Sequence, residues 1–335
     1  MKFLVIGLGS MGKRRVRNLI ALGYKDNVVG FDLREDRRSE AEAYGITTYE
    51  NFSTVIEEYK PDAFLISTPP NFHMYYAEFA EKKGIHCFIE ASVVDAEKIL
   101  ELSKKVANTD IVMAPSCTMR FYSAPIKIKE LINHNIIGDV LNYNYQTGQY
   151  LPDWHPWEEI EEFYVSNPDT GGCREIVPFE LTWINDIFGD SKPLACVRRK
   201  LTDMPANIDD IYHCLLEHSN NIIGNLTVEV VSRPQATREI RILGSKGEIV
   251  YSADDNELRY INTEMKDWER INFDIGTVEE GYINPEEPYI NEIKAYVEAI
   301  QKISKYPNTL EDDYKILQTL YKLEEISEGR DDLSR

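Results

Sequence analysis

Three glycines follow directly on a short apolar run near the start of the chain. Residues 2–6 read KFLVI, and the GLGSMG that follows places Gly7, Gly9 and Gly12 in GxGxxG spacing. In this spacing the first glycine permits a tight turn, the second lets the backbone approach a pyrophosphate, and the third lets a helix pack on a strand. The next residues have apolar side chains at helical spacing and stop at Gly23, which indicates a helix with free N–H groups at its start. The chain is therefore expected to begin with a strand–turn–helix unit that binds a dinucleotide.

A second apolar run, NVVGFD, ends on an acid. Asp32 lies twenty residues beyond Gly12, where a carboxylate would accept hydrogen bonds from an adenosine ribose. A glycine turn in an unrelated sheet with an incidental Asp is the weaker alternative. Asp32 would repel a 2′-phosphate, which favours NAD over NADP, and Arg34 would offset part of that preference.

Apolar strands and helical segments then alternate up to residue 116. Strands are expected at 62–67, 85–90 and 110–114, each after a helical segment. Near-continuous apolar strands between helices predict a parallel, doubly wound sheet covered on both faces, with ligands at the carboxyl ends of the strands. Glu90 ends one of these strands, so we expect it to face the cofactor.

The charge and the cysteines exclude several classes of partner. The net charge is −20, of which −2 lies up to Ser116 and −18 after it. Phosphates need a basic footprint, so neither nucleic acid nor an anionic membrane is expected as a partner. The five cysteines contain no CxxC pair, which favours the reducing cytoplasm and gives no metal signature. No apolar run approaches the ~20 residues of a membrane span, and no signal peptide is expected.

Further segments carry a resemblance to a known family. With GLGSMG at the start, STPPNFH at 67–73 and GIHCFIE at 84–90, the chain resembles the glucose–fructose oxidoreductase / inositol dehydrogenase / MocA (Gfo/Idh/MocA) family. Arg120-Phe121 and the segment 238–251 extend the likeness over nearly the whole chain. The resemblance implies an α/β Rossmann domain followed by an α+β domain with a large, mostly antiparallel open sheet. It also implies oxidation or reduction of a sugar or polyol carbon with nicotinamide.

The resemblance assigns domains, partners and cofactor-binding residues. The NAD-binding domain would span 1–116 and the substrate and oligomerisation domain 117–335, with terminal helices at 286–328. A homodimer or homotetramer through the open sheet is expected. The cofactor would be held by Gly7, Gly9, Ser10, Met11, Gly12, Asp32, Arg34, Ser67, Thr68, Pro69, Asn71, His73, Glu90 and Ala91. Among these, Asn71 resembles a helix cap, and His73 could instead support only the loop.

The residues that usually move the proton are replaced. The family has Lys and then Pro after this glutamate, whereas this chain has Ala91 and Ser92. The Lys normally touches the nicotinamide and the reacting hydroxyl, and Ala91 has neither a donor nor a charge. In the segment 170–189 the family's histidine falls on Phe179, its later acid on Thr182, and its first acid on Ile176 or, with a shift of one, on Glu175.

A different base is therefore needed. Glu180 lies within the apolar stripe of the helix expected around 178–188, and it is the leading candidate for the general base. Burial would disfavour its charge, whereas a position in the first helical turn would favour it. The alternative, given equal weight, is a structural ion pair of Glu180 with Arg174 or Arg120. Glu175 is the second candidate, if the helix begins before Pro178.

The segment 148–164 is rich in aromatic and acidic residues. Such side chains suit a sugar, whose C–H face stacks on aromatic rings while its hydroxyls bond carboxylates. Packing or a subunit contact is the alternative. His155 is a candidate proton shuttle, although surface histidines are commoner. The expected substrate-binding residues are Arg120, Tyr150, Trp154, Trp157 and Arg174.

Three functions agree with these features. The first is an NAD-dependent oxidoreductase acting on a sugar, amino sugar or nucleotide sugar with a non-standard base. The second retains NAD through each turnover, as an epimerase, lyase or glycosidase would, without net redox change. The third is a non-catalytic NAD-binding sensor or partner protein.

Overall fold

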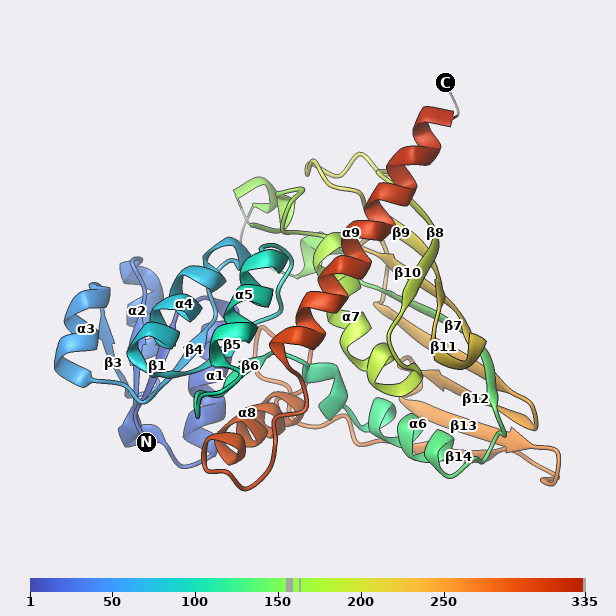
Figure 1. Ribbon diagram of the computed structural model, residues 1–335, viewed down its shortest axis with the longest axis horizontal. Helices are drawn as coiled ribbons and strands as arrows, with labels where there is room; N and C mark the ends of the chain where they lie inside the picture. The colour runs from blue at the N-terminus through green and yellow to red at the C-terminus, as the bar shows by residue number, and fades with distance from the viewer. Residues whose placement is uncertain (155–158, 163, 334–335) are drawn as a thin grey trace. The chain divides into compact units, whose positions relative to one another are not determined.

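The computed structural model describes residues 1–154, 159–162 and 164–333 (Figure 1). The chain divides into two compact units. The first contains Met1–Phe121 and Gly276–Tyr314, and the second contains Tyr122–Ile275 and Lys315–Arg335. The units differ from the two continuous domains expected from the sequence, 1–116 and 117–335, because a late segment belongs to the first unit.

The first unit is built on a parallel sheet. Over the described residues this sheet has six strands in the order β3-β2-β1-β4-β5-β6. The strands are Phe3–Ile6 (β1), Val28–Phe31 (β2), Thr47–Tyr49 (β3), Ala63–Ile66 (β4), His86–Ile89 (β5) and Met113–Pro115 (β6). The helices are Ser10–Ala21 (α1), Glu35–Glu42 (α2), Phe52–Tyr59 (α3), His73–Lys83 (α4), Ala96–Val106 (α5) and Glu287–Ile300 (α8). The strand order reverses direction beside β1, which is where open α/β sheets bind ligands.

The core of the first unit is formed by its central strands and by helices packed on them. Every residue of β1 and β4 is buried, as expected for central strands with helices on both faces. Helix α8 adds Ile293, Tyr296 and Val297 to the same apolar cluster as Phe3 and Leu19. This packing places a C-terminal segment in the N-terminal unit.

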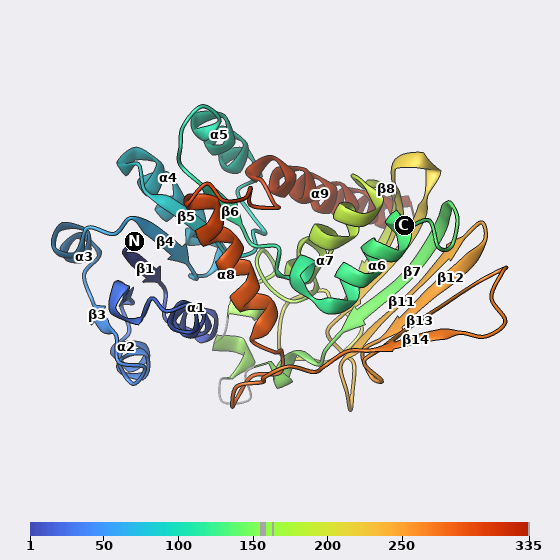
Figure 2. The same ribbon diagram turned by 90° about the horizontal axis from the view of Figure 1, so that it is seen from below.

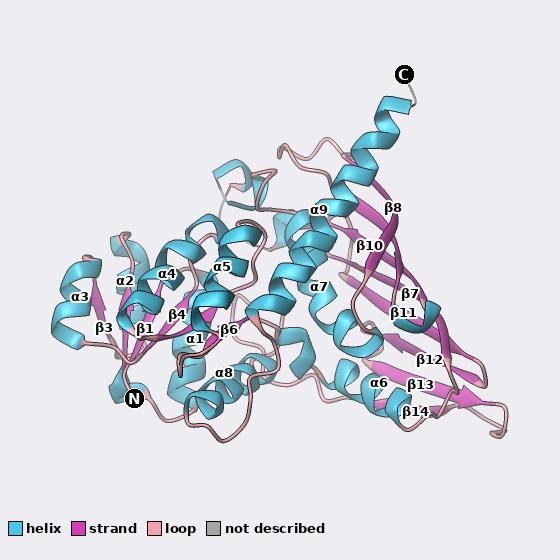
Figure 3. Ribbon diagram, viewed as in Figure 1, coloured by secondary structure: helices cyan, strands magenta, loops and turns pink. Residues whose placement is uncertain are grey.

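The second unit contains a larger sheet with mixed pairing. Within the described chain its eight strands have the order β14-β13-β12-β11-β7-β10-β9-β8, and only β7 and β10 pair in parallel (Figure 3). The strands are Val140–Gly148 (β7), Lys192–Arg199 (β8), Ile211–Glu217 (β9), Ile223–Glu229 (β10), Thr237–Gly244 (β11), Gly247–Ser252 (β12), Glu257–Asn262 (β13) and Glu269–Asn272 (β14). The expected fold class is confirmed: a Rossmann-type parallel sheet and a large, mostly antiparallel sheet.

One face of the large sheet is covered by helices. Helices α6 (Ser123–Asn133) and α7 (Cys173–Phe188) lie over this face (Figure 2), and the last helix is α9 (Leu310–Leu333). Tyr143 and Tyr145 of β7 point into the core, whereas Leu215 of β9 lies on the other face and is partly exposed. Helix α7 begins at Cys173, five residues before Pro178. The helix expected around 178–188 therefore starts earlier than predicted, and Pro178 lies inside it.

No helix in the described ranges is both long enough and apolar enough to cross a membrane.

Candidate functional site

The three glycines of the first turn have different roles. Gly7 has φ +85°, and a Cβ there would lie 2.7 Å from the carbonyl oxygen of Ser67. A Cβ on Gly12 would lie 1.8 Å from the carbonyl oxygen of Gly7, so α1 could not pack on the turn. A Cβ on Gly9 would meet nothing closer than the Arg37 guanidinium, at 3.6 Å. Packing therefore requires Gly7 and Gly12, whereas Gly9 leaves the backbone open to a ligand.

The start of α1 is available to an anion. Gly9 is the N-cap residue, and no side chain caps the helix. The first N–H groups of a helix have no intrahelical acceptor, so here they can bind phosphate oxygens. Ser10 and Met11 are partly exposed at this end. This geometry fits the expected pyrophosphate site, whose residues stay a prediction.

Asp32 joins the end of β2 to the glycine turn. Its Oδ2 accepts the Leu8 N–H at 2.7 Å and its Oδ1 accepts the Arg34 N–H at 2.9 Å. Each carboxylate oxygen has a second lone pair, which a ribose hydroxyl can use. The side chain of Arg34 bonds Asp36 at 3.0 Å.

Arg37 on α2 was not identified from the sequence. Its Nη1 lies 3.9 Å from Asp32 Oδ2, and it is the side chain nearest to Gly9. A guanidinium beside an open glycine can neutralise a phosphate. Only its position one helical turn after Arg34 could have indicated this. Together, the open turn, the uncapped helix and these charged groups fit a dinucleotide.

The loop after β4 is held from within. His73 is buried, its Nε2 lies 2.8 Å from the Thr68 carbonyl oxygen, and burial lowers the pKa of this histidine. The contact with Thr68 supports a structural role for His73 in this loop, and its place in the cofactor site stays a prediction. Asn71 is exposed, and the residue before α4 is Phe72 without a side-chain cap, so the expectation that Asn71 caps the helix is wrong. Pro69 precedes a short 3₁₀ turn, and Thr68 Oγ1 is buried without a hydrogen-bond partner in the described structure.

Glu90, at the end of β5, points at a buried arginine. Arg15 of α1 donates from Nε and Nη2 to the two carboxylate oxygens, at 2.6 and 3.0 Å. Ser67 Oγ lies 3.4 Å from Glu90 Oε1. Arg15 therefore orients Glu90 before any ligand binds. A carboxylate held in this way is suited to accept hydrogen bonds from ribose hydroxyls.

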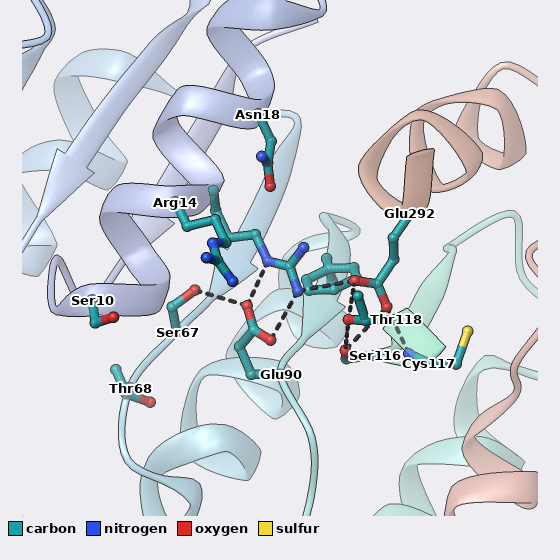
Figure 4. A network of polar contacts seen from close by, with 12 residues as sticks. Ser10, Arg14, Asn18, Ser67, Thr68, Glu90, Ser116, Cys117, Thr118 and Glu292 are labelled. Atoms are coloured by element: carbon teal, nitrogen blue, oxygen red, sulfur yellow. Dashed lines mark hydrogen bonds and ion pairs between the residues drawn. The ribbon is translucent and has the colours of Figure 1, made fainter. Parts of the chain in front are cut away.

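A second carboxylate stands behind this pair. Glu292 of α8 lies 2.9 Å from Arg15 Nη2 and accepts from the Cys117 N–H at 2.6 Å and from Thr118 Oγ1 at 2.7 Å (Figure 4). Burial by itself lowers the pKa of Arg15, but the nearby Glu90 and Glu292 outweigh it and the pKa is raised. Arg15 is thus a permanent cation between two acids. The sequence gives no sign of this, since Arg15 lies in a basic run that is typical of a solvated face.

The side chain of Ala91 has no polar atom, and Ser92 beside it is buried. Ser92 is hydrogen-bonded to the side chain of Asp313 in the first turn of α9. Asp313 was not among the expected site residues.

Glu180 is enclosed in the second unit. It is fully buried on α7, and its Oε2 accepts from Tyr145 and Trp183 at 2.7 Å each. Arg238 Nη2 lies 2.8 Å from Oε1. Burial alone would lower the pKa of Arg238, but Glu180 outweighs it and raises that pKa. This arrangement supports the structural ion pair, with Arg238 as partner in place of Arg174 or Arg120, and as a general base Glu180 stays a prediction.

The other predicted residues are held in separate contacts. Glu175 lies in the first turn of α7 and accepts from the Tyr164 hydroxyl at 2.9 Å. Arg174 pairs with Glu324 at 2.7 Å, and Arg120 bonds Asn308 at 3.4 Å. The Arg233 guanidinium lies 3.7 Å from the ring centre of Tyr150.

The aromatic segment is described only in part. Trp154 Nε1 is buried without a hydrogen-bond partner in the part of the chain that the structure describes. His155 and Trp157 lie outside the described residues, so their predicted roles stay predictions.

Comparisons with known proteins agree with this fold and site. The family model of the Gfo/Idh/MocA oxidoreductases, described as an NAD-binding Rossmann fold, matches residues 1–113. The model of the C-terminal domain of the same family matches residues 126–250. The expectation of NAD as cofactor is confirmed. A search of curated proteins finds no match.

Solved structures resemble the chain over almost its whole length. An oxidoreductase from Agrobacterium radiobacter, in complex with NAD+, L-tartaric acid and magnesium, has a TM-score of 0.84 at 14% identity, covering 98% of this chain and 96% of its own. Levoglucosan dehydrogenase in complex with NADH has a TM-score of 0.82 at 16% identity, covering 98% and 97%. An oxidoreductase domain protein from Kribbella flavida has a TM-score of 0.83 at 19% identity, with the same coverage. At these identities the likeness shows a shared fold.

Proposed function

Because the chain belongs to the Gfo/Idh/MocA family of NAD-binding oxidoreductases, we propose that it oxidises a secondary alcohol of a sugar-like molecule, or reduces the corresponding ketone. NAD, when bound, accepts or returns the hydride. The observation that carries this proposal is Glu90, which Arg15 fixes at the carboxyl edge of the sheet that also contains the open glycine turn.

The residues of the first unit divide the binding between them. Gly9, Ser10 and Met11 at the start of α1 would bind the pyrophosphate, with Arg37 as counter-charge. Asp32 would bind the adenosine ribose, and Glu90 the nicotinamide ribose. The fixed geometry of these groups orients the reacting ring, which contributes to rate because a bound reactant needs no further alignment.

The substrate class rests on two considerations. Levoglucosan dehydrogenase, which shares this fold, has been solved with NADH and levoglucosan and with NADH and L-sorbose. The segment 148–164 of this chain supplies aromatic rings and acids suited to a polyhydroxylated ligand. We therefore favour a sugar, amino sugar or nucleotide sugar. A homodimer or homotetramer through the exposed face of the large sheet completes the proposal, since that face presents Leu194, Val197, Leu215 and Ile223.

Absorbance of NADH tests the reaction directly. Purified protein is mixed with NAD+ and a panel of levoglucosan, L-sorbose, L-tartrate, amino sugars and nucleotide sugars, and NADH formation is followed. Steady formation with one of them is expected. Substrate conversion at constant absorbance would favour the NAD-retaining alternative, and NAD binding without conversion across the panel would favour the non-catalytic one. Both alternatives are tested because Ala91 has no side-chain group that can transfer the proton of a net oxidation.

A further inference from the structure

Oxidation of an alcohol releases a proton as well as a hydride, and Ala91 cannot accept it. The proton acceptor must be a group that changes its charge near neutral pH and is not neutralised by a fixed cation. Buried carboxyl groups are the natural candidates, because desolvation favours their protonated form.

Most of the buried or partly buried carboxylates discussed above, and three others among the described residues, have several donors. Glu90 and Glu180 are paired with arginines, and Glu286 is paired with Arg14 and Arg17. Asp210 and Glu229 each accept from at least two backbone N–H groups. Such groups are stabilised as anions and are poor proton acceptors.

Asp313 differs from all of these. Asp313 is 4% exposed. Its carboxyl group accepts a hydrogen bond from the Ser92 side chain, and its Oδ2 has no hydrogen-bond partner within the described ranges. None of the ion pairs found among the described residues includes it. A buried carboxylate with one donor has a strong reason to take up a proton.

The charges around Asp313 act in the same direction. Burial raises the pKa of Asp313 to about 7; the hydrogen bond from Ser92 lowers it, and the neighbouring Asp312 raises it. No arginine, lysine or histidine of the described chain contributes to this shift. The first turn of α9 favours the anion, so the group can also release its proton.

The position of Ser92 links this carboxyl group to the site. Ser92 is the second residue after Glu90, in the segment that leaves the carboxyl end of β5, where cofactor and substrate gather in sheets of this type. Ser92 and Asp313 belong to the same compact unit as Glu90 and Arg15.

We propose that Asp313 accepts, through the hydroxyl of Ser92, the proton that the substrate alcohol releases. The C–H bond breaks with its electron pair, which goes to NAD+ as hydride. The O–H bond breaks as its proton passes to Ser92 Oγ, while Ser92 gives its own proton to Asp313. The products are a ketone, NADH and a protonated Asp313, which then loses its proton to solvent. Asp313 acts through Ser92, so it is a positioning and proton-storing residue.

This inference rests on the proposed function, but its first test needs no substrate. The titration of Asp313 is followed by infrared or carbon NMR spectroscopy of aspartate-labelled protein, with NAD+ or NADH bound. A midpoint near neutrality is expected, lower with NAD+ than with NADH, because the positive nicotinamide ring favours a nearby carboxylate. Asp313→Asn should abolish this signal. Equal midpoints with the two cofactors would overturn the proposal, even if the protein proves to be an active oxidoreductase.

Matched variants supply the control. Asp312→Asn removes an equal charge one residue away, and it should keep activity while shifting the midpoint to lower pH. Ser92→Ala should raise the midpoint, and Ser92→Thr should restore the hydroxyl and the original value.

The second test uses whichever substrate of the panel is converted. Asp313→Asn should lower kcat by about 100-fold or more and remove the limb of the pH–rate profile near neutrality, with KM for NAD+ within about threefold. Ser92→Ala should act in the same way, and Ser92→Thr should recover most of the rate. An Asp313→Asn variant that keeps the wild-type pH profile would contradict the proposal.

Discussion

Arg15 donates to both carboxylate oxygens of Glu90, at 2.6 and 3.0 Å, from the middle of the helix that follows the glycine turn. The turn and the end of β5 are therefore joined by a side-chain contact as well as by the sheet. The glycine turn and Glu90, which we propose as NAD-binding groups, are thus linked through Arg15. This contact, the glycine turn and the other buried charges each support a prediction.

Replacing Arg15 should destabilise the fold strongly. Arg15→Met would leave Glu90 and Glu292 buried without their shared cation. Removing one partner of a buried ion pair typically costs about 3–5 kcal/mol. Urea denaturation of the variant measures this loss. The matched control is Lys13→Met on the same helix, whose pair with Glu40 is partly exposed and should cost less than about 1 kcal/mol. Equal losses for the two variants would show that Arg15 is not held as described.

Two glycine substitutions should separate binding from folding. Gly9→Ala adds a methyl group that meets no atom closer than 3.6 Å, so stability should stay close to that of the wild type. NAD affinity, measured by calorimetry, should fall about tenfold or more because the methyl occupies the approach to the backbone. Gly12→Ala places a methyl 1.8 Å from the Gly7 carbonyl oxygen and should reduce stability itself. Unchanged NAD affinity of the Gly9→Ala protein would show that the phosphates of NAD do not bind at this turn.

The stability of the protein should depend on pH through Asp313. Its pKa is raised from an ordinary 3.8 to about 7, so the folded state binds the proton more tightly than the unfolded state. The resulting stabilisation is fully present below about pH 4 and is lost as the pH rises through about 7, with an upper magnitude on the order of 4 kcal/mol. Comparing unfolding free energies of wild type and Asp313→Asn between these limits isolates this contribution. The difference between the two proteins should be flat above about pH 8; a slope confined to more alkaline pH would assign the titration to another group.

Glu180 and Arg238 should behave as a coupled pair. Glu180→Gln leaves the guanidinium of Arg238 without its carboxylate and should destabilise the second unit by about 2–4 kcal/mol. Adding Arg238→Met should return part of that loss, since an apolar replacement of a buried pair is often close to neutral. A double-mutant cycle of unfolding free energies measures the coupling. If Glu180 is also the general base, Glu180→Gln should lower kcat strongly in addition to this loss of stability, and Arg238→Met should not restore kcat.

The parts of the site that the sequence predicts are those made by neighbouring residues. The glycine turn and Asp32 belong to one strand–helix–strand segment, so their spacing alone indicates the geometry. Arg15 and Glu90 are far apart in the sequence, and Glu292 comes from a helix near the other end of the chain. Only tertiary packing brings these three together. A basic run such as KRR is also far more often a solvated surface than the core, and α1 buries both Arg14 and Arg15.

The burial of Asp313 is a second feature that the sequence does not predict. The sequence predicts terminal helices within 286–328 and an acidic run at the start of the last of them, and charged side chains in such a run are ordinarily exposed. Glu311 and Asp312 lie in the same turn, and nothing in the pattern separates Asp313 from them. Burial of one acid against Ser92 depends on the packing of segments more than two hundred positions apart.

The parallel pairing of β7 with β10 constrains how the chain can fold as it leaves the ribosome. Both neighbours of β7, β10 and β11, are encoded after residue 222, so the strand has no partner in its sheet while the intervening chain is being made. Its alternating tyrosines must be shielded by other means during that interval. Nascent chains arrested before β10 should therefore bind chaperones, whereas chains arrested after β11 should not.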